Sequence, residues 1–319
     1  MLKIAVLTSG GDAPGMNPGI RAIVRTAAFN DVKVYGVRSG YKGLIKGDLV
    51  ELSVNSVGDI IQRGGTMLGT ARSPEFETEE GRLKALNVLD VYNIDGLIVL
   101  GGDGSFKGAE HLAKAGIKTV CIPCTIDNDM AYTDYTIGFW TAIETVTDAI
   151  GKLRDTSSSH GRANVIEVMG RNSGQLALYS ALAGGGESII VPEEDVDIDA
   201  ICKKALSGRM RGKKHNLIIV AEGAGKAFDI ADQIIDKTGI DTKVTVLGHV
   251  QRGGSPSAVD RILGSLMGRH AVELLMAGNS SIAIGVKENK IIDMDISQAL
   301  QVKRDFNYSI YDTINILSI

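Results

Sequence analysis

Two carboxylates, Asp127 and Asp129, follow the apolar stretch 119–122 almost directly. That stretch is typical of a short buried β-strand, and in an open α/β sheet ligands bind beyond the carboxyl ends of the strands. Because neighbouring carboxylates repel each other, a metal ion together with a general base is one arrangement that suits them. The alternative is an Asx-turn whose aspartates cap a helix.

Two glycine-rich segments, 9–15 and 101–105, each lie between an apolar stretch and an expected helix. A strand, a glycine loop and a helix N-terminus together form an anion site, and glycine lets backbone N–H groups approach a phosphate without a Cβ in the way. Asp103 is suited to hold Mg²⁺ between phosphates. The spacing is not that of a Walker loop, and the Walker lysine is absent. Each loop alone could be an ordinary tight turn, but two such loops beside an acidic pair favour a phosphate site.

Composition narrows the class of protein. The chain has 319 residues, 44% of them hydrophobic, and a net charge of −4. It can build one or two domains with a large core, and its charge argues against a nucleic-acid surface. No apolar run approaches the roughly 20 residues that span a bilayer, and the first residues are typical of a strand and not of a signal peptide. Three cysteines favour a reducing, cytoplasmic setting, and Cys121 is expected in the core.

The elements that must position these residues alternate between strands and helices. Apolar runs predict strands at 2–8, 32–37, 96–100, 119–122, 164–169, 188–191, 216–221 and 243–247, and a hairpin at 281–294. Helical periodicity predicts helices that end near Phe29, Val91, Ala115, Arg154, Leu182, Met210, Thr238 and Met276. Asn17 and Pro18 are expected to begin the first helix, and 38–49 is expected to be a loop. This alternation predicts a three-layer α/β/α architecture with mainly parallel sheets.

Several motifs in order resemble the bacterial 6-phosphofructokinase family (phosphofructokinase A family), over essentially the full chain. They are Gly10–Asn17, Thr70–Arg72, Gly101–Ser105, Thr125–Asp129, Met169–Arg171 and Leu247–Pro256. The resemblance implies two similar Rossmann-like domains: a larger ATP-binding domain of residues 1–138 and 252–301, and a smaller fructose-6-phosphate-binding domain of residues 139–251 and 302–319.

The reaction that the resemblance implies moves the γ-phosphoryl of MgATP to the 1-hydroxyl of fructose 6-phosphate. Asp127 would accept the hydroxyl proton, and Thr125 would donate to the transferring group. Asp129 would act with Mg²⁺ or orient the sugar, and Arg72 and Arg171 would flank the γ-phosphoryl. ATP would be held by Gly11, Arg72, Ser73, Gly102, Asp103, Gly104 and Ser105, with Asp103 as the Mg²⁺ ligand.

Sugar-phosphate binding would use Thr125, Ile126, Asp127, Arg162, Met169, Gly170, Arg171, Glu222, Lys243, His249, Val250, Gln251 and Arg252. Family members place arginines at positions 162 and 243 against the 6-phosphate of the adjoining subunit, which implies a homotetramer with shared active sites. Position 243 is lysine here, which keeps the charge but loses the bidentate fork.

An effector site for ADP or phosphoenolpyruvate is implied between subunits. Its residues would be Arg21, Arg25, Arg154, Gly185, Glu187, Arg211, Lys213 and Lys214. Arg21 and Arg25 are four residues apart and share one helix face. Some family members carry arginine where Val54 stands, so the sign and strength of the effector response stay open.

Two positions bear on the phosphoryl donor. Gly104 matches ATP users of the family, whereas pyrophosphate users carry a bulky acid there. Cys124 replaces the glycine of ATP users and the lysine of pyrophosphate users, and it is small and uncharged. We therefore expect ATP as donor, with a pyrophosphate-dependent phosphofructokinase as the alternative. A silent nucleotide sensor and a kinase of the NAD kinase type fit less well, because the acidic pair and the motif 247–256 are intact.

Overall fold

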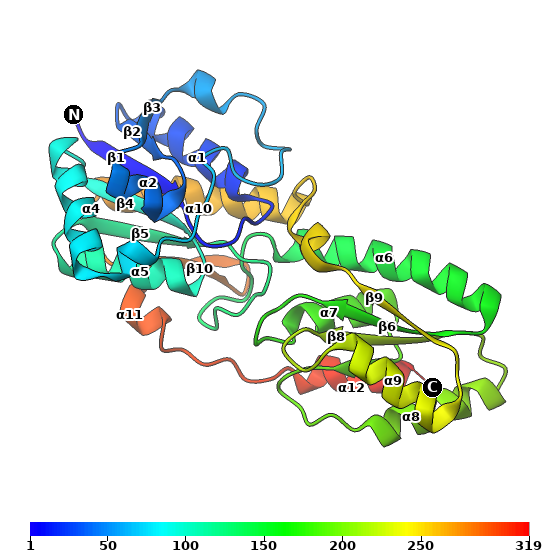
Figure 1. Ribbon diagram of the computed structural model, residues 1–319. Helices are drawn as coiled ribbons and strands as arrows, with labels where there is room; N and C mark the ends of the chain where they lie inside the picture. Colours follow the sequence, from blue (N-terminus) through cyan, green and yellow to red (C-terminus); the bar gives the residue numbers. More distant parts are fainter. Residues whose placement is uncertain (319) are drawn as a thin grey trace. The chain divides into compact units, whose positions relative to one another are not determined.

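The protein is described by a computed structural model that covers residues 1–318 (Figure 1). The chain forms two compact units. Unit 1 contains Met1–Ile126, Met130–Thr141 and Arg252–Arg304; unit 2 contains Asp127–Asp129, Ala142–Gln251 and the chain from Asp305 onward. Within residues 1–318, the helices are all too short or too polar to cross a bilayer.

Unit 1 is built on one sheet in the order β11-β10-β5-β4-β1-β2-β3. The inner strands run parallel, and β3 and β11 pair antiparallel at the two edges. Apolar, β-branched sequences suit central strands that are covered on both faces. The strands are β1 (Lys3–Thr8), β2 (Lys33–Val37), β3 (Leu49–Leu52), β4 (Gly96–Gly101), β5 (Lys118–Pro123), β10 (Ile282–Lys287) and β11 (Lys290–Asp295).

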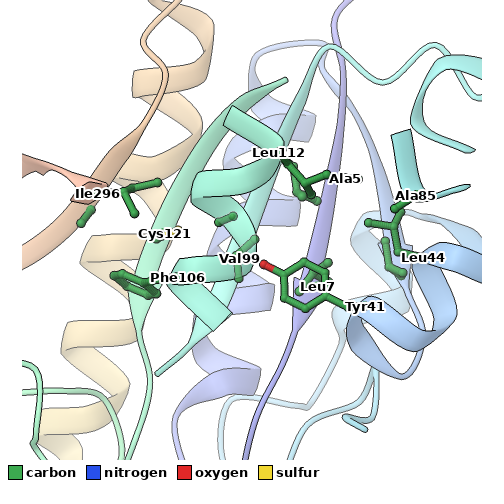
Figure 2. Close-up of a cluster of buried hydrophobic side chains, with 14 of the residues drawn as sticks. Ala5, Leu7, Tyr41, Leu44, Ala85, Val99, Phe106, Leu112, Cys121 and Ile296 are labelled. Carbon is green, nitrogen blue, oxygen red and sulfur yellow. The ribbon is translucent and has the colours of Figure 1, made fainter. Parts of the chain in front are cut away.

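Helices cover both faces of this sheet. The helices of unit 1 are α1 (Met16–Phe29), α2 (Gly40–Lys46), α3 (Pro74–Glu77), α4 (Glu79–Val91), α5 (Asp103–Lys114), α10 (Ala258–Met276) and α11 (Ile296–Ala299), with the 3₁₀ turn η1 (Val54–Val57). Figure 2 shows one core, in which Leu7 and Val99 of the sheet pack with Phe106 of α5. Leu100 follows Val99 in β4 and therefore faces the opposite side of the sheet, where it contacts Gly19 of α1. Unit 1 is therefore a three-layer α/β/α structure, which confirms the expected fold class.

Helices α1 and α10 meet along a glycine seam formed by Gly15, Gly19, Gly264 and Gly268. A Cβ at Gly268 would lie 2.6 Å from the carbonyl oxygen of Gly19, and one at Gly264 would lie 2.9 Å from that of Gly15. Real side chains do not tolerate such distances from backbone atoms, so the seam depends on residues that lack a side chain. The two helices consequently pack backbone against backbone.

Unit 2 has a parallel sheet in the order β7-β8-β6-β9. Its strands are β6 (Ala163–Val168), β7 (Ser188–Ile190), β8 (Asn216–Ala221) and β9 (Thr242–Val246). One face packs in a core with Ile201 of α8 and Ile230 of α9. The remaining elements are α6 (Phe139–His160), whose first turn belongs to unit 1, α7 (Gln175–Gly184), α8 (Ile198–Met210), α9 (Ala227–Thr238), η2 (Gly248–Arg252), whose last residue belongs to unit 1, and α12 (Tyr308–Leu317).

Three local predictions are wrong. Helix α6 does not end near Arg154 but continues to His160. Segment 38–49 is not a loop, because α2 lies within it and β3 begins at Leu49; its glycines occupy the left-handed conformation at Gly40 (φ 58°) and Gly47 (φ 71°) and mark the ends of the helix. Asn17 does not cap α1. Gly15 takes that place, and Asn17 lies inside the first turn with its side chain turned to another loop.

Candidate active site and effector pocket

The two glycine loops lie side by side at the carboxyl ends of β1 and β4. These strands are parallel neighbours, and the N–H of Ser9 donates to the carbonyl of Leu100 at 2.9 Å. The hydroxyl of Ser105 lies below both loops: a Cβ at Gly101 would be 2.4 Å from this oxygen, and one at Gly10 would be 3.4 Å away. Gly102 precedes the first turn of α5, so the backbone donors of a helix N-terminus open beside the first loop.

Thr125 joins these loops from the next strand. The N–H of Cys124 donates to the carbonyl of Gly101 at 2.9 Å, and a Cβ at Gly102 would lie 3.7 Å from the Cβ of Thr125. Gly104 is open, with no atom within 4 Å of where its Cβ would stand among the described residues. The three strand ends singled out from the sequence thus meet at one edge of the sheet of unit 1.

The guanidinium of Arg252 covers the first glycine loop. It donates to the carbonyl of Asp12 at 3.4 Å, and a Cβ at Gly11 would lie 1.9 Å from its Nη1 atom. The planar cation can lie on the loop only because position 11 has no side chain. An arginine fork beside backbone N–H groups suits phosphate oxygens.

Arg72 and Ser73 lie on a segment that is tied to the same loop. The hydroxyl of Thr70 donates to the carbonyl of Gly10 at 2.7 Å, and Arg72 itself is exposed. Upstream, the buried Asn17 donates to the carbonyls of Arg63 and Gly64, each at 3.1 Å, and accepts from the N–H of Met67 at 2.7 Å. Asn17 therefore fixes the start of the segment that carries Arg72.

The carboxylate of Asp103 is suited to bind a Mg²⁺ ion that is also bound to the phosphates of a nucleotide. Its carboxylate is in the first turn of α5, is 41% exposed and pairs with Lys107 at 2.7 Å. Among residues 1–318, His, Cys, Asp and Glu side chains do not assemble a metal cage of their own. Mg²⁺ commonly takes one or two carboxylates and completes its shell with phosphate oxygens and water, so a single accessible carboxylate beside a phosphate loop fits it.

The residues Asp127–Asp129 belong to unit 2. Asp127 is 3% exposed, and Asp129 lies 3.7 Å from the guanidinium of Arg171. Arg171 adopts a left-handed φ of 54°, its N–H donates to Glu222 Oε1 at 2.9 Å, and its side chain is 64% exposed. An uncommon backbone conformation held by a carboxylate, with the cation left accessible, is typical of a functional position.

Met169 and Gly170, which are predicted to bind the sugar, follow the end of β6 beside η2. The N–H of Met169 donates to Gln251 Oε1 at 3.1 Å, and Gln251 donates in turn to the carbonyl of Gly248 at 2.9 Å. Gln251 thus anchors η2, which presents His249 and Val250 as exposed side chains. Gly170 follows Met169 with a φ of 139°.

Arg162 directly precedes β6, and Lys243 lies on the neighbouring parallel strand β9. The two side chains pair with the same carboxylate. Arg162 Nε lies 2.6 Å from one oxygen of Asp241, and Lys243 Nζ lies 2.8 Å from the other. Hydrogen bonds from Lys243 and Arg162 lower the pKa of the Asp241 carboxyl. The cations are partly exposed and remain available to a ligand.

A separate pocket of about 300 Å³ lies in unit 2. Its lining includes Arg154, Gly185, Glu187, Lys213 and His215. Glu187 is buried, lies 3.0 Å from Lys213 and 3.3 Å from His215, and accepts from the N–H of Leu217 at 2.6 Å. Arg154 donates to the carbonyls of Gly184 and Gly185. Cations around one buried acid make a site for a multiply charged anion.

Other predicted effector residues do not line this pocket. Arg211 and Lys214 are exposed outside it, and Arg21 and Arg25 lie on α1 of unit 1. Conversely, His215 was not predicted as a site residue. The signal for it in the sequence is its place at the end of the basic run 211–215. The sequence does not reveal its contact with Glu187.

Comparisons with known proteins agree on one family. A family model described as phosphofructokinase matches residues 3–275. The ATP-dependent 6-phosphofructokinase of Clostridium tetani (strain Massachusetts / E88) is 61% identical over 318 residues, and that of Finegoldia magna (strain ATCC 29328 / DSM 20472 / WAL 2508) is 59% identical over 319; each alignment covers 100% of both chains.

Solved structures give the same result. Phosphofructokinase from Saccharomyces cerevisiae superimposes with a TM-score of 0.89 at 38% identity, covering 100% of this chain and 47% of the yeast chain. Pyrophosphate-dependent phosphofructokinase from Marinobacter aquaeolei gives a TM-score of 0.85 at 21% identity, which shows a shared fold alone. Family model, full-length relatives and fold together establish that this chain belongs to the phosphofructokinase family.

Proposed function

We propose that this chain transfers the γ-phosphoryl of MgATP to the 1-hydroxyl of fructose 6-phosphate, giving fructose 1,6-bisphosphate and ADP, the committed step of glycolysis. The observation that carries the proposal is the full-length identity of about 60% to relatives named ATP-dependent 6-phosphofructokinase. The paired glycine loops, which lie beside Thr125 and an accessible Asp103, are what a phosphoryl donor requires.

Phosphoryl transfer depends on positioning and on neutralising charge more than on covalent chemistry. In our proposal, unit 1 holds ATP through the loops at Gly11 and Gly102–Ser105, through Ser73 and through the exposed Arg72. Asp103 holds Mg²⁺, which supplies charge neutralisation at the phosphates when it is bound. The segment 70–73 is tied to the first loop by the bond from Thr70 to Gly10.

Unit 2 supplies the acceptor side of the reaction. Asp127 accepts the proton of the sugar hydroxyl, and its burial keeps water away from that carboxylate. Arg171 approaches the transferred group, and Asp129, which pairs with Arg171, orients the cation or acts with the metal. Glu222, Met169, Gly170 and the η2 residues His249–Gln251 bind the sugar phosphate, with Arg162 and Lys243 at the 6-phosphate of an adjoining subunit. Arg252, which belongs to unit 1, also binds the sugar phosphate in our proposal.

ATP is favoured over pyrophosphate as the donor. At position 104, pyrophosphate users carry a bulky acid, whereas Gly104 leaves this space open. Cys124 is buried, and burial, together with the charge of Asp260, raises the pKa of its thiol well above the usual range. The side chain at position 124 therefore stays neutral and supplies no cation for a pyrophosphate.

We further propose that the pocket of Arg154, Glu187 and Lys213 binds an effector, ADP or phosphoenolpyruvate, and that Arg21 and Arg25 of an adjoining subunit complete it in a homotetramer. The support is the cationic lining around a buried acid. We place the reaction in the cytoplasm, since Cys121, Cys124 and Cys202 are all free thiols.

The test is turnover of fructose 6-phosphate with ATP, and separately with pyrophosphate, by the native chain and by Asp127→Asn. We expect activity with ATP alone, and a fall in kcat of roughly 10²–10⁴-fold in the variant, because a positioned general base contributes that much. The exposed Asp155 on α6 offers a matched control, Asp155→Asn, that keeps kcat. Equal turnover by native chain and Asp127→Asn would overturn the base assignment, and turnover with pyrophosphate alone would overturn the donor.

A further inference from the structure

Asp260, in the first turn of α10, has a carboxylate that is fully buried. Its Oδ1 atom accepts from the N–H of Gly138 at 2.8 Å. Its Oδ2 atom accepts from the N–H of Thr141 at 2.8 Å, from the hydroxyl of Thr141 at 2.5 Å and from the hydroxyl of Ser257 at 3.1 Å. A buried carboxylate is costly unless it is hydrogen-bonded in this way, so the network holds the residues around it firmly.

The network closes on itself. The hydroxyl of Thr141, which donates to Asp260, also accepts from the N–H of Ser257 at 2.9 Å, and the N–H of Asp260 donates to the hydroxyl of Ser257 at 3.2 Å. Each hydroxyl therefore both donates and accepts, and removing one member disturbs the others. The beginning of α10 and the beginning of α6 are locked to each other within unit 1.

The segment that Asp260 holds, residues 136–141, supports the backbone of Thr125. The hydroxyl of Thr136 donates to the carbonyl of Thr125 at 2.6 Å, and the N–H of Thr125 donates to the carbonyl of Ile137 at 3.0 Å. Ile137 in turn donates to the carbonyl of Pro123 at 2.9 Å and forms a parallel bridge with Cys124. We call residues 136–141 the brace segment.

The brace segment also contacts the first glycine loop. Gly138 has a left-handed φ of 103°, and a Cβ there would lie 2.7 Å from the Cβ of Ala13 and 3.4 Å from a methyl of Ile126. Position 138 thus lies between the loop that carries Gly11 and the residue after Thr125. One buried carboxylate fixes the segment that touches both.

We propose that Asp260 is a positioning residue for phosphoryl transfer. It acts through the brace segment on the backbone of Thr125, and Thr125 in turn leads directly into Asp127–Asp129. The expected change in kcat rests on the proposed function. The claim that Asp260 holds the brace segment in place does not. A displacement of about 1 Å at reacting groups costs on the order of 10²-fold in rate, which sets the scale of the effect.

Ionisation of Asp260 offers a second readout. Burial raises the pKa of its carboxyl, and the hydrogen bonds from Thr141, Gly138 and Ser257 lower it in part. An ionisable group that faces it is the thiol of Cys124, which is buried and stays protonated. Loss of a donor therefore raises the pKa of Asp260 further, and the acid limb of kcat moves to higher pH.

The experiment compares Asp260→Asn, Thr141→Val and Thr141→Ser with the native chain, using kcat, KM for both substrates and the pH profile of kcat. We expect Asp260→Asn to lower kcat by about 10–100-fold with KM for ATP changed less than about threefold. Thr141→Val lowers kcat less and shifts its acid limb upward, and Thr141→Ser, which keeps the hydroxyl, restores both.

A matched control is Asp295→Asn, because Asp295 also accepts from backbone N–H groups and hydroxyls at a helix N-terminus, that of α11. It alters stability but leaves kcat and its pH profile unchanged. Equal kinetic effects of Asp260→Asn and Asp295→Asn, or identical acid limbs in Thr141→Val and the native chain, would overturn the proposal. Where Asp260→Asn does not fold, the Thr141→Val and Thr141→Ser pair decides.

Fluorescence separates this inference from the proposed function. Trp140, the single tryptophan of the chain, lies in the brace segment with its ring 5.1 Å from that of Tyr135. We expect acrylamide quenching of Trp140 to increase in Thr141→Val and Asp260→Asn but not in Thr141→Ser or Asp295→Asn. Unaltered quenching in all variants would overturn the inference even if the native chain is an active kinase, and altered quenching would support the brace even if it is not.

Discussion

Arg162 and Lys243 share a single carboxylate, that of Asp241, although Arg162 directly precedes β6 and Lys243 lies on β9, the next strand of the sheet. The guanidinium binds one oxygen at 2.6 Å and the ammonium binds the other at 2.8 Å. The pair therefore presents two cations side by side with a fixed spacing. Two adjacent cations suit a phosphate group, and the lysine lacks the bidentate fork that an arginine would offer.

Replacing that lysine tests its role. We expect Lys243→Ala to raise KM for fructose 6-phosphate roughly tenfold with kcat nearly unchanged, because a hydrogen bond to a charged group contributes about 1.5–3 kcal/mol, and least at exposed positions. Lys243→Arg is expected to lower KM. Steady-state kinetics with varied fructose 6-phosphate measures both, and a KM that is the same in all three proteins would remove Lys243 from the site.

Gly11→Ala tests the contact between the first glycine loop and Arg252. The added methyl would occupy the place of the guanidinium, so we expect Arg252 to be displaced and KM for fructose 6-phosphate to rise. The double variant with Arg252→Ala should be no worse in this parameter than Arg252→Ala alone, since both changes remove one interaction. Fully additive effects of the two substitutions on KM would contradict the expected displacement.

Lys213→Ala tests the proposed effector pocket. Lys213 pairs with the buried Glu187 in the pocket, and its loss should weaken ADP binding roughly 10–100-fold, as expected for a charged hydrogen bond. Calorimetric titration with MgADP in the presence of a non-hydrolysable ATP analogue, which occupies the active site, measures this. The exposed Lys203 on α8 provides the control variant Lys203→Ala, and equal ADP affinity in the two variants would argue against the pocket.

Ile98→Ala tests the core of unit 1. Ile98 of β4 is fully buried, and removing its side chain is expected to lower the free energy of unfolding by about 2–5 kcal/mol. Ile262→Ala on α10 is the matched control, because that isoleucine is 58% exposed, and its effect should stay within about 0.5 kcal/mol. Denaturant unfolding followed by circular dichroism measures both, and similar losses would contradict the assigned burial.

Asp295 gives a prediction with a defined sign in pH. Hydrogen bonds from Ser297 and Ser281 and from backbone N–H groups lower the pKa of its carboxyl. The stability that it contributes is therefore present above the ordinary pKa of about 4 and is lost as pH falls through the lowered value. The difference in unfolding free energy between the native chain and Asp295→Asn should be constant near neutrality and shrink on acidification. A difference that grows toward low pH would be the opposite result.

The architecture could be predicted because its signals are local and periodic. Strands such as β4 and β8 are continuous apolar runs, and α8 and α10 follow helical spacing within a few residues of the expected ends. The prediction for segment 38–49 is wrong because frequent glycines are typical of a loop, whereas here Gly40 and Gly47 mark the ends of a short helix. The prediction for Asn17 is wrong because its side chain, which is of a type that often caps helices, accepts a hydrogen bond from the distant Met67 instead.

Side chains that act through distant partners could not be predicted. An acidic residue in the first turn of a helix is ordinary, because it favours the helix dipole, so nothing in the sequence distinguishes Asp260 from Asp229 or Asp199. Only the fold brings Asp260 to Gly138 and Thr141, more than a hundred residues earlier in the chain. The same holds for His215, which the sequence places in a basic run and the fold places beside Glu187.

The glycine seam between α1 and α10 limits how this protein can be altered. Helix α1 carries Arg21 and Arg25, and α10 begins with the network of Asp260. The seam has no room for even a methyl group at Gly264 or Gly268. A bulky label or substitution there would separate α1 from α10 and so disturb both the arginines of α1 and the network of Asp260. For design and labelling, the two helices have to be handled as one inseparable part.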